Sequence, residues 1–165
     1  MAGWPSGPQR KELASFLPHV GSEDVKRFFE LDPDDLRWVL SHRVDSRLGV
    51  ALQLCSLRWL GFVPDALAEL PDPALLSLCA RLESDPDDLW VYGARAQTRS
   101  DHFQAVRRRA GFRALDAEER SPFEQWLALW AMEHERPKAL WELGCEHLLA
   151  ERVERPPVGT RCCSC

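Results

Sequence analysis

The fold is decided by residues 47–61, whose sequence is RLGVALQLCSLRWLG. When the side chains are placed at 100° per residue, the apolar ones form two stripes on different sides of one helix. The first stripe contains Leu48, Ala51, Leu52, Cys55 and Trp59, and the second contains Val50, Leu54 and Leu57. We therefore predict a helix buried on two sides at the centre of a bundle. Gly61 would end it, because glycine readily adopts the left-handed conformation.

A strip of small or uncharged polar side chains separates the two stripes. It consists of Ser46, Gly49, Gln53 and Ser56, which are three and four residues apart. One interpretation is that another helix approaches closely over these small residues. In a second interpretation, Gln53 faces a partner such as the edge of a DNA base.

Composition limits the class of protein. The chain has 165 residues, of which 45% are hydrophobic, enough for one domain or two small ones with a real core. The longest apolar run, residues 48–63, is interrupted by Gln53 and Arg58 and is too short and polar to span a membrane. The N-terminus has no basic stretch followed by an apolar one, and Cys55, Cys79 and Cys145 occupy apolar helix positions, so we expect a cytoplasmic protein without a disulfide framework.

Nearly every segment between the termini has helical periodicity, and none alternates as a strand would. Helices are predicted at residues 8–17 and 73–84, and others are predicted to start at a Ser22 cap, at Asp32-Pro33 and at Pro137. Capping boxes predict two more helices, one from Thr98 to Gly111 and one, with a stronger box, from Ser121 to about residue 136. The short turn at residues 42–45 joins two of them as in a helix-turn-helix. The predicted fold class is all-α, a multi-helix bundle.

Asp-Pro pairs recur at Asp32, Asp72 and Asp85, and the five residues from Asp85 nearly copy those from Asp32. This repetition indicates either a duplicated domain or, more simply, a good helix start used three times. We predict one helical unit at residues 8–84, a second at 85–156 that carries an arginine-rich helix, and a disordered Cys-rich tail at 157–165.

The densest charge lies between Tyr92 and Arg113, where Asp101 is the single acid. The arginines of this segment are Arg95, Arg99, Arg107, Arg108, Arg109 and Arg113. On the predicted helix, Arg107 and Arg109 flank the apolar side and Arg108 points away from it. Such side chains can bind phosphates or read guanine edges, or they can form a solvated face paired with acids elsewhere. The spacing alone leaves both interpretations open, and the net charge of −5 excludes only a protein that is basic all over.

Three blocks of sequence, in order, resemble one known family. The first contains Arg47-Leu48-Gly49, Leu52 to Cys55, Leu57-Arg58-Trp59 and Gly61; the second contains Tyr92, Arg95, Thr98, Arg99 and His102, followed by residues 111–113; the third contains Arg136-Pro137, Arg152-Val153, Pro156 and Thr160. Together they resemble the N-terminal region of Tn3-family replicative transposases over about residues 10–160. Ser46 and Ala114 depart from the family's usual residues, so any polar contact from position 46 is in doubt.

The resemblance implies helical DNA-binding domains that recognise the terminal inverted repeats of a transposon. In that family a separate ribonuclease-H-like domain, further along the chain, cuts and joins DNA with a carboxylate triad and divalent metal. We therefore expect double-stranded DNA as partner, self or full-length transposase as a further one, no membrane, no cofactor, no metal and no enzymatic activity. The expected DNA-binding residues are Arg43, Arg47, Gln53, Arg58, Arg95, Arg99, His102, Arg107, Arg108, Arg109 and Arg113.

Two other functions compete with this one. The first is a helical interaction or dimerisation module, in which the strip at Ser46 to Ser56 docks another helix. The second is an inhibitory fragment that occupies transposon ends without cutting them. A zinc site at Cys145 and His147 with His134 is too sparse in ligands to favour. The cysteines at 162, 163 and 165 suggest a truncated or frameshifted reading frame, and the sequence assigns them no role.

Overall fold

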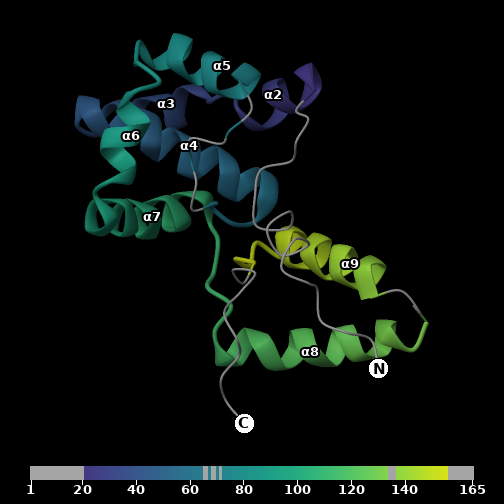
Figure 1. Cartoon of the computed structure of the whole chain (residues 1–165). Coiled ribbons are helices and arrows are strands. Elements are labelled where there is room, and N and C mark those ends of the chain that lie inside the picture. Colours follow the sequence, from purple (N-terminus) through teal and green to yellow (C-terminus); the bar gives the residue numbers. More distant parts are fainter. Residues whose placement is uncertain (1–20, 65–66, 68–69, 71, 134–136, 156–165) are drawn as a thin grey trace.

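The computed structural model describes residues 21–64, 67, 70, 72–133 and 137–155, and these residues form an all-α fold (Figure 1). The helices are α2 Ser22–Phe28, α3 Pro33–Leu40, α4 Val44–Leu60, α5 Asp72–Leu82, α6 Asp88–Gly93, α7 Ala96–Ala110, α8 Ala117–Ala131 and α9 Pro137–Ala150. Among the described residues, extended pairing is limited to one isolated bridge between Arg113 and Val153. The predicted fold class is confirmed. Residues 8–20 and the tail at 157–165 lie outside the described residues.

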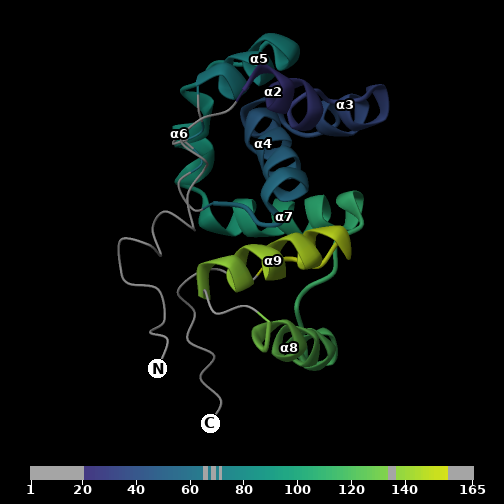
Figure 2. The same ribbon diagram turned by 90° about the vertical axis from the view of Figure 1, so that its right-hand side faces the viewer.

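Helix α4 is the centre of the bundle. Twelve of its 17 residues are buried, including both predicted apolar stripes and the strip between them. Helices α2, α3, α5, α6 and α7 surround it (Figures 1 and 2). It ends at Gly61, whose φ of 75° is the left-handed conformation that only glycine adopts without strain. The prediction of a helix buried on two sides is therefore confirmed.

The strip on α4 is a surface for close packing. Gly49 lies directly beneath the ring of Tyr92 on α6, so closely that an added Cβ would be 2.2 Å from a ring carbon. Ser46 and Ser56 are buried, and Gln53 donates a hydrogen bond to the backbone carbonyl of Arg99 at 3.0 Å. Helices α6 and α7 thus occupy the strip, as the first interpretation predicts.

The helix starts agree with the sequence at Asp32 and at Pro137, where α9 begins, and differ from it at α2, α7 and α8. The Asp32 side chain accepts hydrogen bonds from the amides of Asp34 and Asp35, with Pro33 in the first turn. In contrast, α2 starts after Gly21 and α7 starts at Ala96, ahead of Thr98. The predicted start at Ser121 is wrong, because the side chain of Asp116 caps α8 five residues earlier, and α8 ends at Ala131 rather than near 136.

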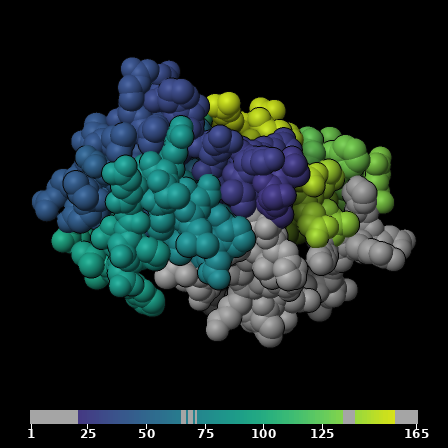
Figure 3. Space-filling model, turned by 90° about the horizontal axis from the view of Figure 1, so that it is seen from above, coloured from purple at the N-terminus to yellow at the C-terminus, as the bar shows by residue number. Residues whose placement is uncertain are grey.

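Helices on both sides of residue 84 contribute to one core cluster. Leu89 and Tyr92 of α6 and Val106 of α7 belong to the same core cluster as α4. Helices α8 and α9 form a hairpin beside this body, with α8 farthest from α4 (Figure 2). Seen from above, the segments around 22–50 and 72–93 form one continuous surface, and the hairpin lies to one side (Figure 3). None of the helices in the described ranges combines the length and apolarity that a bilayer span requires.

Candidate nucleic-acid interface

A buried carboxylate holds two of the predicted arginines at one end of α7. Asp35 on α3 is 1% exposed, and it accepts hydrogen bonds from Arg58 of α4 and from Nε of Arg109, the latter at 2.9 Å. Burial raises the pKa of Asp35, but the hydrogen bonds and charges of the two guanidinium groups outweigh it, so that pKa lies below its usual value. One ionised carboxylate therefore fixes two cations, and the group keeps an excess positive charge.

The same arrangement occurs at the other end of α7. Asp45, in the first turn of α4, accepts a hydrogen bond from Nη1 of Arg95 at 2.8 Å and lies 3.4 Å from Nε of Arg43. The hydrogen bond from Arg95 and the nearby guanidinium charges lower the pKa of Asp45. Both outer arginines stay largely accessible, with side chains 82% and 44% exposed for Arg43 and Arg95. This group also carries an excess positive charge.

A row of rings connects the two groups along the line where α3 meets α7. The ring of Trp38 lies 4.7 Å from that of His42, and the ring of His42 lies 5.3 Å from that of His102. The Tyr92 hydroxyl and Nδ1 of His102 are 3.2 Å apart, and the Arg109 guanidinium lies 5.9 Å from the Trp38 ring. We call this row the α3–α7 seam; it comprises Asp35, Trp38, His42, Asp45 and His102 with Arg43, Arg58, Arg95 and Arg109.

His102 is expected to make the stability of the fold depend on pH. Burial and the neighbouring His42 lower its pKa, more than Asp101 and Asp45 raise it. The unfolded chain therefore takes up this proton more readily, and stability is expected to fall as pH drops below the ordinary value of 6.5. Replacing His102 with glutamine is expected to make the free energy of unfolding less dependent on pH between 7.5 and 5.5, measured by urea denaturation. If the pH dependence of the free energy of unfolding is unchanged, other titrating groups control it, because these groups are present in both proteins.

The remaining predicted residues lie in different surroundings. Arg108 is exposed on α7, opposite the buried Val106 and Ala110, as predicted. Arg107 pairs with Glu154 at 3.3 Å. Arg47 donates to the backbone carbonyls of Leu40 and His42, at 2.8 and 3.1 Å, and so keeps its net charge.

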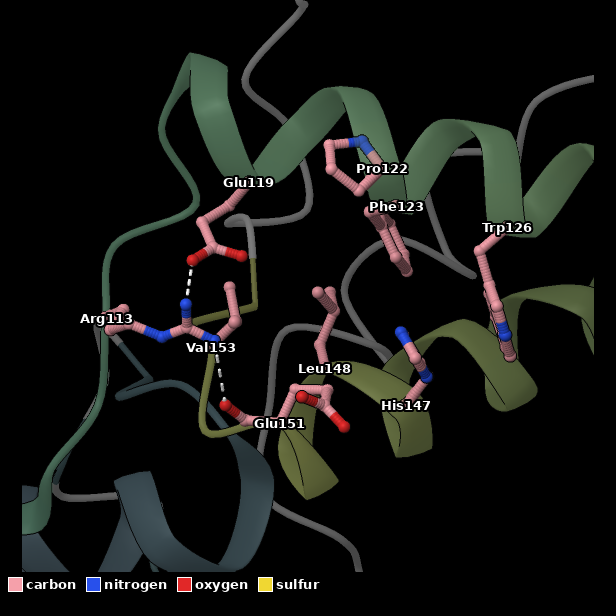
Figure 4. A pocket seen from close by; sticks show the side chains of 9 residues that line it. All are labelled: Arg113, Glu119, Pro122, Phe123, Trp126, His147, Leu148, Glu151 and Val153. Carbon is pink, nitrogen blue, oxygen red and sulfur yellow. Dashed lines mark hydrogen bonds and ion pairs between the residues drawn. The ribbon is translucent and has the colours of Figure 1, made fainter.

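Arg113 connects the bundle to the α8–α9 hairpin. Its guanidinium donates to the Glu119 carboxylate on α8 and, at 3.3 Å, to the backbone carbonyl of Glu151 (Figure 4). It lines a hollow of about 260 Å³ between α8 and α9, in which the rings of Trp126 and His147 stack 4.0 Å apart. Arg113 therefore links the bundle to the α8–α9 hairpin.

Gln53 meets the backbone of Arg99 away from the seam. Gln53 is 1% exposed, its amide donates to the carbonyl of Arg99, and the residue lines a small pocket. A contact from Gln53 to base edges in a groove would require the helices to separate. The close-packing interpretation of the strip accounts for its position, so we leave Gln53 out of the interface.

Asp35 is the residue that the sequence interpretation missed. Acids in the first turn of a helix are favoured by the helix dipole, so Asp35 does not stand out in the sequence. The available signal was its spacing of four from Val39, which places both on the buried face of α3, where they are 1% and 0% exposed. Six of the predicted arginines thus share four carboxylates: Arg58 and Arg109 share Asp35, Arg43 and Arg95 share Asp45, Arg107 pairs with Glu154, and Arg113 pairs with Glu119.

One family model matches most of the chain. Residues 6–161 match the domain of unknown function DUF4158, which covers both the α3–α7 seam and the hairpin. The chain belongs to the DUF4158 family.

Curated relatives of this DUF4158 chain are transposases. The chain is 31% identical over 153 residues, 92% of its length, to the transposase for transposon Tn21 of Escherichia coli. It is 36% identical over 86 residues, 52% of its length, to the transposase for transposon Tn501 of Pseudomonas aeruginosa. These alignments span 15% and 9% of the relatives' lengths. The resemblance to the N-terminal region of Tn3-family transposases is confirmed.

Proposed function

We propose that the described helices bind transposon ends as double-stranded DNA, through the α3–α7 seam and the outer face of α7. The observation that carries this proposal is the surplus of guanidinium groups over carboxylates at the two ends of α7. Each shared carboxylate orients two arginines and neutralises only one, so a phosphate backbone would meet fixed positive charge. Transposase relatives support DNA as the partner. In this proposal, the described region recognises DNA and takes no part in cutting it.

The competing interaction-module function loses its main support. It required the strip on α4 to be available for another helix, and α6 and α7 already cover that strip.

The acidic pairs Asp34-Asp35 and Glu118-Glu119 lie in first turns of helices, where the helix dipole favours them. Among the described residues, no three His, Cys, Asp or Glu side chains are grouped so that they could hold a metal ion.

The test measures DNA affinity against salt. The full chain is titrated with a duplex carrying the terminal inverted repeat of its own element, at several salt concentrations, and separately with a scrambled duplex. Engagement of about six phosphates predicts a slope near −5 for log K against log salt. Changing Arg43 and Arg108 together to alanine is expected to make this slope shallower by about 2 and to weaken both duplexes, because each side chain would contact one phosphate.

Arg81 provides the matched control. It is an exposed arginine on α5, on the side of the bundle away from α7 (Figure 1). Its change to alanine removes the same charge and should leave the slope unchanged. A slope near zero for the unmodified chain would contradict phosphate binding, and equal affinity for the two duplexes would contradict recognition of transposon ends.

A further inference from the structure

A second polar feature lies on a different side of α7 from the seam. It is a pocket of about 260 Å³ between α4, the first turns of α7 and the two segments near residues 62–64 and 154–155. This volume is just below the about 300 Å³ at which pockets for drug-sized ligands begin, so the pocket suits a single ring system. Nothing in the proposed seam uses it.

Gln53 is one of the residues that line this pocket, and it carries an acceptor without a donor. Its side chain is 1% exposed, and its Nε2 donates to the carbonyl of Arg99 at 3.0 Å. That bond fixes the orientation of the amide, because a carbonyl can accept only from the NH₂ side. Among the described residues, no group donates to Oε1 of Gln53, which is buried. A buried acceptor of this kind calls for an N–H or O–H donor from a molecule in the pocket.

The pocket walls favour a planar, electron-rich ring. Phe62 and Phe103 supply aromatic surfaces, and the Arg155 guanidinium lies 4.0 Å from the Phe62 ring centroid. Arg99 adds a second guanidinium to the lining, and the Glu154 carboxylate can accept from an amino group. Aromatic rings, guanidinium groups and a few hydrogen-bonding atoms are how proteins hold an unstacked base and its phosphate.

We propose that this pocket binds one nucleobase, with an N–H of the base donating to Oε1 of Gln53. The inference rests on the proposed function for its source, an unstacked base of the bound DNA; a free nucleotide has the same chemistry. One N–H of Nε2 is engaged by Arg99, and the proposed contact uses Oε1 alone. All four bases carry an N–H donor, so the pocket accepts bases with little sequence preference.

The first experiment uses the full chain labelled with ¹⁵N and monitors the side-chain NH₂ signals of Gln53 by NMR. Deoxyadenosine monophosphate is expected to shift these signals and the amides of Ala96 and Ser100, both at the pocket. Deoxyribose 5-phosphate, which lacks the base, is expected to bind at least about 10-fold more weakly, the loss of one stacked base. Equal shifts from both compounds would overturn the proposal, because they would report phosphate alone.

A variant that fills the pocket provides the second readout. Ser100 is an exposed pocket residue, and Ser100→Trp is expected to abolish the response to deoxyadenosine monophosphate. Gln97→Trp adds the same ring to an exposed position of α7 outside the pocket and should leave the response intact. Nucleotide binding by Ser100→Trp within twofold of the unmodified chain would overturn the proposal even if both variants fold normally.

A DNA arm distinguishes the two sources of the base. A duplex with one unpaired adenine is compared with a duplex in which that adenine is replaced by an abasic site. Tighter binding of the adenine duplex by about 10-fold, lost in Ser100→Trp, supports a base from DNA. A response to the free nucleotide alone assigns the pocket to nucleotides instead. Salt-dependent binding of paired duplex without any base effect leaves the proposed function intact and overturns only the pocket.

Discussion

Replacing Gly49 with alanine is expected to lower the free energy of unfolding by about 2 kcal/mol. The added Cβ would lie between 2.2 and 2.4 Å from three ring carbons of Tyr92, a residue that is 1% exposed and cannot move aside without displacing α6. Overpacking of a filled core costs about 1–3 kcal/mol and occasionally more, and here it outweighs the gain of about 1 kcal/mol that alanine brings to a helix. Urea denaturation followed by circular dichroism measures the change.

Gly93 is the matched control for this substitution. It ends α6, and a Cβ built there meets nothing within 4 Å. Gly93→Ala should therefore be neutral or slightly stabilising, since alanine restricts the unfolded chain. A Gly49→Ala protein as stable as the Gly93→Ala protein would show that α6 does not pack on α4 as described.

Replacing Asp35 with asparagine is expected to cost about 2–3 kcal/mol of unfolding free energy at pH 7. Breaking a buried ion pair costs about 3–5 kcal/mol, but Arg58 and Arg109 are about one-third exposed, so water recovers part of the loss. The pKa of Asp35 is lowered in the folded protein, so its contribution is present above the ordinary value of 3.8 and disappears as pH falls below it. The difference between the two proteins should therefore shrink at acid pH.

Asp34 offers a comparison one residue away. Its side chain is 69% exposed and pairs with Arg37, whose side chain is 78% exposed. Asp34→Asn should change stability by less than about 1 kcal/mol, as exposed pairs do. Similar losses for Asp34→Asn and Asp35→Asn would mean that the shared carboxylate does not organise this end of α7.

The sequence predicts the centre of the fold well because local periodicity determines it. The two apolar stripes of α4 follow from residue spacing alone, and so does the exposure of Arg108 opposite Val106 and Ala110. The Asp32 cap follows from residue type and its neighbour Pro33. In each case the deciding atoms lie within one or two helical turns, where sequence patterns carry the information.

The sequence predicts the site less well because long-range partners determine it. Arg109 and Asp35 are 74 residues apart, and Arg95 and Asp45 are 50 apart, so spacing could not reveal that two arginines share one acid. The interior position of Gln53 likewise depends on Arg99, 46 residues away. The misplaced start of α8 has a local cause: Asp116 and Ser121 both offer caps, and choosing Asp116 leaves Pro122 inside the helix.

The paired arginines at Asp35 and Asp45 also affect how any anion would be received. A free arginine side chain loses rotamer freedom when it binds, at a cost of up to about 2 kcal/mol. Arg58, Arg95 and Arg109 are already held by their carboxylates, so folding has ordered them in advance. Association through these side chains should therefore carry a smaller entropic penalty than association through freely rotating surface arginines, and calorimetry would register it as a less unfavourable TΔS.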